Sequence, residues 1–188
     1  TGWREALQRT SFRHARHRHT WQGRLCKEDA IVRETSAFLS VGRVVGLWRH
    51  PVKSMAAEIL DTVDVSWHGL AGDRRWAFVR DGLSQSGLPW LTLREHGTLN
   101  RYQPSFDDPS LPDRSRTVVR TPTGASFDVA DPELAKELWP AGARVIRQNR
   151  GIFDTFPLSI ISTQTIDRLG DLLGTRLDVR RFRPNLLI

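Results

Sequence analysis

The pattern of hydrophobic and polar positions in this chain changes near residue 41. Upstream, the run Arg13–His19 is made of basic and histidine side chains and has no apolar periodicity. Such a segment cannot bury enough apolar surface to offset the entropy lost on ordering. We therefore expect residues 1–40 to form a disordered or non-native basic tail outside the globular part.

Downstream of residue 41, short apolar segments alternate with turn signals. Segments rich in valine, isoleucine and aromatic residues predict β-strands. These strands are predicted at 41–48, 59–67, 75–79, 90–93, 117–120, 126–129, 144–147 and 177–182. Turns or loops are predicted at 68–73, 81–82, 87–89, 104–112 and 121–124.

Two helices interrupt the predicted strands. Asp131 followed by Pro132 gives an N-cap and a first-turn proline, and this helix is expected to end near Trp139. A second helix is predicted over 163–173 and stops at Gly174. Because strands and helices do not alternate regularly, a doubly wound sheet is not expected. The sequence predicts a mainly β, β-rich α+β fold with barrel or sandwich character and two short helices.

Length and composition narrow the class of protein. A chain of 188 residues can hold one medium domain or two small ones. It contains no run of about 18 apolar residues and no signal peptide, so no membrane span is expected. Cys26 is the only cysteine, which excludes an intrachain disulfide and fits a reducing, cytoplasmic location.

The formal charge of +7 suggests a nucleic-acid partner, but its distribution does not. Residues 1–40 hold 8 Lys and Arg against 4 acidic residues, and the remaining chain holds 20 against 17. Arginine outnumbers lysine 25 to 3, although a surface that follows phosphates has no need to exclude lysine. A GC-rich coding bias explains the excess of arginine over lysine, and we expect no nucleic-acid partner.

Motifs for common catalytic sites are missing from the sequence. It has no Gly-rich phosphate loop, no CxxC, no nucleophile elbow and no HExxH. His14, His17 and His19 have no acidic or cysteine ligand in register with them. We therefore predict no catalytic residue and no metal ligand within this sequence.

Basic and amide residues instead gather where predicted strands begin and end. Each could be a surface cation or part of a structural salt bridge. Strand ends also cluster at a barrel mouth, where ligands bind. Together they suit an anionic small molecule with a phosphate and a hydrogen-bonding heterocycle, and we expect Lys53, Ser54, Arg74 and Arg183 to converge on one concave face. The residues concerned are Lys53, Ser54, Arg74, Arg94, Arg183 and Asn185.

Four segments resemble the MOSC family, which is named after the C-terminus of the molybdenum cofactor sulfurase. Residues 46–55, GLWRHPVKSM, resemble the YPVKS opening of the MOSC N-terminal β-barrel domain. Residues 69–76 resemble its GL-x-GDR-x-W motif, and residues 91–95 its TxRE motif. Residues 154–169, followed by RFRPN at 181–185, resemble the start of the MOSC domain. The resemblance implies an N-terminal β-barrel domain at 41–150 and a truncated MOSC domain at 151–188.

This resemblance implies a molybdenum cofactor (molybdopterin). In the amidoxime-reducing members, positions like Lys53, Ser54 and Arg74 hold the phosphate end, and positions like Arg183 and Asn185 contact the pterin. The resemblance also adds Thr155 to the cofactor-binding set, which already includes Arg94 of the TxRE motif. His50 replaces the usual tyrosine, and Phe156 replaces a small polar residue. The family's metal-ligating cysteine lies beyond the RFRPN motif, so we expect the sequence to be an N-terminal fragment.

The function implied by the resemblance is that of an oxidoreductase that reduces N-hydroxylated or related N–O substrates and takes electrons from a redox partner protein. A non-catalytic cofactor carrier or sulfur-transfer module is the alternative, and a basic nucleic-acid binder is a remote one. The family's association with pyridoxal phosphate belongs to a separate cysteine desulfurase domain, of which the sequence shows no trace. The small-molecule partners that the resemblance implies for this protein are a cofactor and a substrate.

Overall fold

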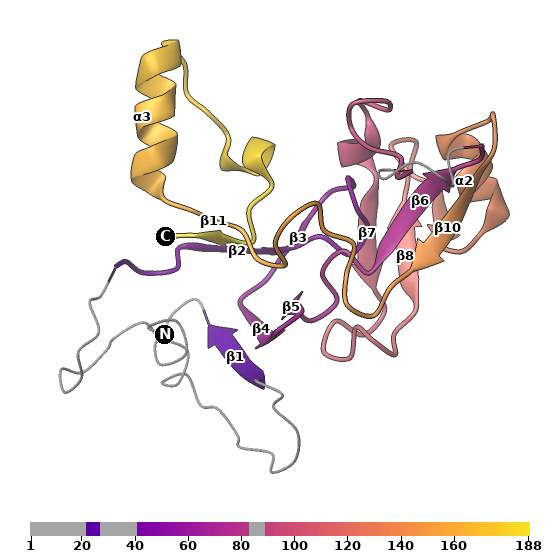
Figure 1. Ribbon diagram of the computed structural model, residues 1–188, viewed down its shortest axis with the longest axis horizontal. Helices are drawn as coiled ribbons and strands as arrows, with labels where there is room; N and C mark the ends of the chain where they lie inside the picture. The colour runs from indigo at the N-terminus through magenta and orange to yellow at the C-terminus, as the bar shows by residue number, and fades with distance from the viewer. Residues whose placement is uncertain (1–21, 27–40, 83–88) are drawn as a thin grey trace. The chain divides into compact units, whose positions relative to one another are not determined.

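The computed structural model describes residues 22–26, 41–82 and 89–188 (Figure 1). Contacts within the chain define two compact units. Unit 1 comprises the described part of Thr1–Trp48, together with Ile59–Ala71 and Phe156–Ile188. Unit 2 comprises Arg49–Glu58 and Gly72–Thr155. Both units are discontinuous in sequence, and the predicted domain boundaries after residues 40 and 150 stay predictions.

Unit 1 is built on two small sheets. The first has the strand order β11–β12–β2–β3, and the second has the order β1–β4–β5. Their apolar core is formed by Leu47, Val63, Leu70 and Leu186. The strands are β1 (Gln22–Cys26), β2 (Gly46–Arg49), β3 (Glu58–Ile59), β4 (Thr62–Ser66), β5 (Gly69–Leu70), β11 (Ile160–Ile161) and β12 (Leu186–Leu187).

Unit 2 also contains two sheets, both antiparallel. β6 (Trp76–Arg80) pairs with β10 (Ala143–Arg147). β8 (Thr117–Arg120) lies between β7 (Gln103–Phe106) and β9 (Ser126–Asp128). The helix α2 (Pro132–Leu138) and the 3₁₀ helix Leu99–Arg101 complete the unit. The core residues are Val52, Met55, Phe78, Leu91, Leu99, Tyr102, Val119, Val129, Leu134, Ala135 and Leu138.

Both predicted helices are confirmed. Local hydrogen bonds and backbone conformation set where they begin and end. α2 (Pro132–Leu138) begins where the Asp131 carboxylate accepts the N–H of Glu133 at 2.9 Å. α3 (Thr163–Leu173) ends at Gly174, whose φ of 63° is left-handed. Within the described ranges, no helix has the length and apolar character that crossing a bilayer requires.

The mainly β class is confirmed, but two predicted strands are wrong. Residues 179–182 form a 3₁₀ helix, because the Asp178 carboxylate accepts the N–H of Arg180 at 2.9 Å and pairs with its guanidinium. Residues 90–93 form only a bridge from Trp90 to Val79, followed by a turn. The predicted turn at 68–73 contains the short strand β5, and the predicted loop at 104–112 begins inside β7.

Residues 22–26 form β1, which pairs antiparallel with β4 and which the sequence did not predict. The rest of the predicted tail lies outside the described residues.

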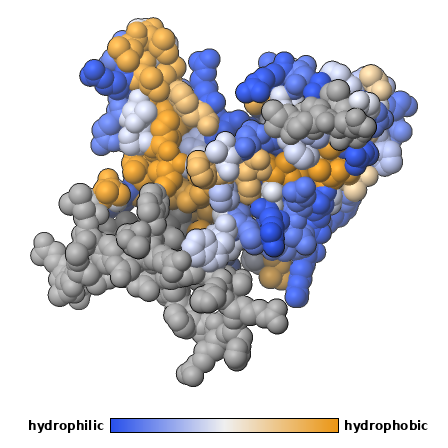
Figure 2. Space-filling view, viewed as in Figure 1, coloured by the Kyte–Doolittle hydropathy of each residue, from blue (hydrophilic) through white to orange (hydrophobic). Residues whose placement is uncertain are grey.

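Toward the other terminus, α3 leaves two apolar side chains exposed near its end, Leu172 at 72% and Leu173 at 65%. Figure 2 shows apolar surface over this helix.

Candidate functional site

In unit 2, the turn that carries Lys53 and Ser54 lies beside the start of β6. The Lys53 N–H donates to the carbonyl of Trp76 at 2.8 Å, and the Trp76 N–H donates to that of Pro51 at 3.2 Å. Val52 is fully buried in the apolar core. Backbone pairing and this apolar anchor therefore fix where the Lys53 and Ser54 side chains begin.

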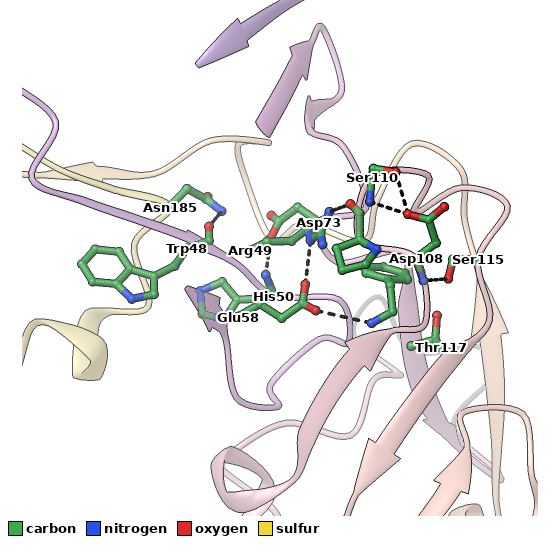
Figure 3. A network of polar contacts seen from close by, with 12 residues as sticks. Trp48, Arg49, His50, Glu58, Asp73, Asp108, Ser110, Ser115, Thr117 and Asn185 are labelled. Atoms are coloured by element: carbon green, nitrogen blue, oxygen red, sulfur yellow. Dashed lines mark hydrogen bonds and ion pairs between the residues drawn. The ribbon is translucent and has the colours of Figure 1, made fainter. Parts of the chain in front are cut away.

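A buried carboxylate ties the same segment to Arg74. Asp73 is fully buried and accepts the N–H of His50 at 2.7 Å (Figure 3). Its carboxylate also forms an ion pair with the Arg74 guanidinium. The Arg74 N–H in turn donates to the His50 carbonyl at 2.6 Å. Asp73 was not among the predicted site residues, and its place in the GDR motif was the signal available.

Arg49, which directly precedes His50 in the sequence, is a second buried cation next to this segment. Arg49 is 1% exposed, and its Nε donates to the Glu58 carboxylate at 2.7 Å (Figure 3). Its guanidinium also lies 4.6 Å from the centre of the Phe106 ring. These contacts satisfy the Arg49 charge inside unit 2, which indicates a structural role.

Lys53 and Arg74 both contact the segment 152–154. The Lys53 ammonium lies 2.8 Å from the Asp154 carboxylate, and the Ile152 N–H donates to the Arg74 carbonyl at 2.8 Å. The Arg74 guanidinium lies over the Phe153 ring at 5.9 Å. The structure thus brings two predicted cations to one loop, where the exposed Thr155 directly follows Asp154.

The backbone at three predicted site residues is left-handed. Among the described residues, the non-glycine residues with positive φ are Ser54 (68°), Arg74 (48°) and Arg183 (51°). This conformation costs a residue with a Cβ atom about 1–2 kcal/mol. Strain of this kind gathers where a side chain must be held in a particular direction for binding.

Replacing Ser54 by glycine is expected to separate stability from binding. Glycine adopts the left-handed region without a Cβ clash, so Ser54→Gly should be about 1 kcal/mol more stable than Ser54→Ala in urea unfolding. Both variants lack the hydroxyl, and each should bind inorganic phosphate roughly fivefold more weakly than the unaltered chain. Equal stability of the two variants would contradict a cost of the left-handed backbone at Ser54, and unaltered phosphate binding by either would contradict a contact between its hydroxyl and phosphate.

Arg94 lies in an exposed turn and not at the end of a strand. The Glu95 carboxylate accepts the Thr92 N–H at 3.0 Å, and the Thr92 hydroxyl accepts the Arg94 N–H at 3.2 Å. The hydrogen bond from the Thr92 hydroxyl holds the pKa of Glu95 below its usual range. The contact predicted between Arg94 and a cofactor stays a prediction.

Asn185 belongs to unit 1, where its buried amide connects separate segments. Its Oδ1 accepts the Ser159 N–H at 3.1 Å, and its Nδ2 donates to the Trp48 carbonyl at 3.2 Å (Figure 3). The side chain is fully buried. The amide therefore has a structural role within the unit, and its predicted contact with a pterin stays a prediction.

Arg183 is the left-handed C-cap of the 3₁₀ helix Val179–Phe182, also in unit 1. Its N–H donates to the Arg180 carbonyl at 3.1 Å. Because Arg183 and Lys53 belong to different units, their predicted convergence on one face stays a prediction.

Unit 1 also contains a cleft of about 910 Å³ between α3 and the segment that follows it. None of the predicted site residues lines this cleft. Its lining residues are Thr163, Ile166, Asp167, Gly170, Asp171, Gly174, Thr175, Arg176, Leu177, Val179 and Leu187.

The donors around Lys53 suit an anion better than a metal ion. They are an ammonium, a guanidinium and a hydroxyl, all of which can donate hydrogen bonds to phosphate oxygens. Across residues 22–26, 41–82 and 89–188, no group of three or more His, Cys, Asp and Glu could hold a metal ion. Cys26 lies in β1, opposite Thr62 of β4.

Comparison with protein families gives one match. The profile of the MOSC N-terminal beta barrel domain matches residues 41–147, more than half of the chain. The matched region includes Lys53, Ser54, Arg74 and Arg94. Comparisons with curated proteins and with solved structures found no match.

Proposed function

Because the chain belongs to the MOSC N-terminal beta barrel domain family, we propose that unit 2 binds the phosphate end of a molybdenum cofactor. Lys53 and Arg74 supply positive charge, and Ser54 supplies a hydroxyl that donates to a phosphate oxygen. This donor set fits a phosphate ester, for which charge-assisted hydrogen bonds are the strongest contacts.

The observation that carries this proposal is the left-handed backbone at Ser54 and Arg74. Backbone hydrogen bonds hold both turns in place. The Lys53 N–H, next to Ser54, donates to Trp76 at the start of β6, and the Arg74 N–H donates to His50. A serine and an arginine are costly choices for such positions, where glycine is the unstrained one. Binding of a phosphate through the two side chains explains why glycine does not occupy either position.

We also propose that the chain is part of an oxidoreductase that reduces N-hydroxylated or related N–O compounds and receives electrons from a redox partner. This rests on the four segments that resemble motifs of the MOSC family, a family that includes the amidoxime-reducing proteins. When bound, the cofactor supplies two-electron oxygen-atom transfer. The residues of unit 2 hold the phosphate end in place and leave the reacting end to other groups. The pterin contacts of Arg183, Asn185 and Thr155 are part of the same proposal.

Comparing molybdopterin with its dephosphorylated form tests which end of the cofactor unit 2 recognises. We expect the chain to bind dephosphorylated molybdopterin about tenfold to a hundredfold more weakly, because charge-assisted hydrogen bonds to the phosphate are lost. The measurement is anaerobic titration followed by pterin fluorescence. Equal affinity for the two ligands would rule out recognition of the phosphate, even if both bind.

A further inference from the structure

The ion pair between Lys53 and Asp154 is strongly asymmetric. Only 6% of the Lys53 side chain is exposed, whereas 73% of the Asp154 side chain is exposed. The ammonium lies 2.8 Å from the Asp154 Oδ1 and 3.5 Å from the Ile152 carbonyl oxygen. In the described part of the chain, Asp154 is the carboxylate that compensates this buried charge.

Burial makes Lys53 the fixed partner and Asp154 the movable one. The Lys53 backbone is hydrogen-bonded to Trp76, and the neighbouring Val52 is locked in the core. A buried ammonium without an anion is costly, so Lys53 needs a negative partner at all times. The exposed Asp154 carboxylate, by contrast, regains its hydration by a rotation of its own side chain.

We propose that Asp154 sets the affinity of the anion site by occupying the Lys53 ammonium until a phosphate oxygen displaces it. The exchange replaces one ion pair by another, and no covalent bond forms or breaks. It keeps the buried charge compensated in the ligand-free protein. It also makes binding weaker than the donors alone would give, because every ligand must first release Asp154. This inference rests on the proposed function in one respect, namely that Lys53 faces an anionic ligand.

The variant Asp154→Asn tests the proposal in the full 188-residue chain. Asparagine keeps the size of the side chain and a carbonyl oxygen that accepts from Lys53, but it carries no charge. In calorimetric titrations with inorganic phosphate at constant ionic strength, we expect the Kd to fall roughly threefold to tenfold. Asp107→Asn, which removes an exposed charge elsewhere in unit 2, should leave the Kd unaltered.

A double-mutant cycle separates this effect from general electrostatics. Because Asp154 acts through Lys53, Asp154→Asn should change phosphate affinity in the unaltered chain and leave it unaltered in a Lys53→Met background. An equal gain in both backgrounds would overturn the proposal, since the aspartate would then repel phosphate without occupying Lys53.

Two other outcomes distinguish this inference from the proposed function. If Lys53→Met weakens phosphate binding but Asp154→Asn leaves it equal or weaker, the inference fails and the anion site stands. If neither the unaltered chain nor Asp154→Asn binds phosphate, both fail. A thermal melt provides the second readout: phosphate should raise the Tm of Asp154→Asn more than that of the unaltered chain.

Discussion

Replacing Asp73 by alanine is expected to remove about 3–5 kcal/mol from the free energy of unfolding. The carboxylate is fully buried and compensates the Arg74 guanidinium, of which 15% is exposed. Its loss also removes the acceptor of the His50 N–H. Since domains of this size unfold with about 5–15 kcal/mol, urea unfolding should show a large fall in the transition midpoint.

Asp178→Ala is the matched control for this prediction. Asp178 also accepts a backbone N–H and pairs with an arginine, Arg180, but its side chain is 45% exposed. Exposed ion pairs contribute little to stability, so this variant should lose much less than Asp73→Ala. If the two variants lose equal stability, Asp73 is not the buried anchor described here. Asp73→Asn should fall between them, because its amide oxygen still accepts the His50 N–H.

Lys53→Met is expected to abolish most anion binding without unfolding the protein. Removing one partner of a buried ion pair is costly when the charge left behind is buried, but the Asp154 left behind here is exposed to water and regains its hydration. Methionine is apolar, of similar length, and suits the buried position of Lys53. The free energy of unfolding should therefore stay within about 1 kcal/mol of its original value. The affinity for inorganic phosphate should fall at least about tenfold, the contribution of a charge-assisted hydrogen bond.

Lys136→Met controls for the loss of one positive charge. Lys136 lies on α2, its side chain is 73% exposed, and its ammonium is 3.9 Å from Glu133. It should leave phosphate affinity unaltered at physiological ionic strength. A similar loss of affinity in both lysine variants would mean that phosphate responds to net charge and not to a built site.

The elements predicted correctly from sequence are those whose limits depend on neighbouring residues. The N-cap at Asp131 and the left-handed Gly174 each act within one helical turn, so both helices were found at their observed positions. The strand predicted at 177–182 is wrong, also because a neighbouring residue sets the local structure. Its apolar and polar alternation favoured a strand, but Asp178 caps the next turn and bends it into a 3₁₀ helix.

The residues of the proposed anion site were predicted only in part. Lys53, Ser54 and Arg74 were identified as candidate ligands, and the structure gives two of them strained backbones. The partners of these residues were missed, because Asp154 lies 101 positions from Lys53 and meets it only in the folded chain. Arg94 was expected at the end of a strand, and the hydrogen bonds between Thr92 and Glu95 place it in a turn instead.

The most direct test of the central claim is to observe Lys53 while phosphate binds. The sequence contains only three lysines, Lys27, Lys53 and Lys136, so ¹⁵N labelling of lysine side chains gives three ammonium signals to assign by substitution. In a titration with inorganic phosphate, we expect the Lys53 signal to shift and saturate with the binding curve, while the Lys136 signal stays in place. A Lys53 signal that does not move while phosphate saturates the protein would contradict the proposed site.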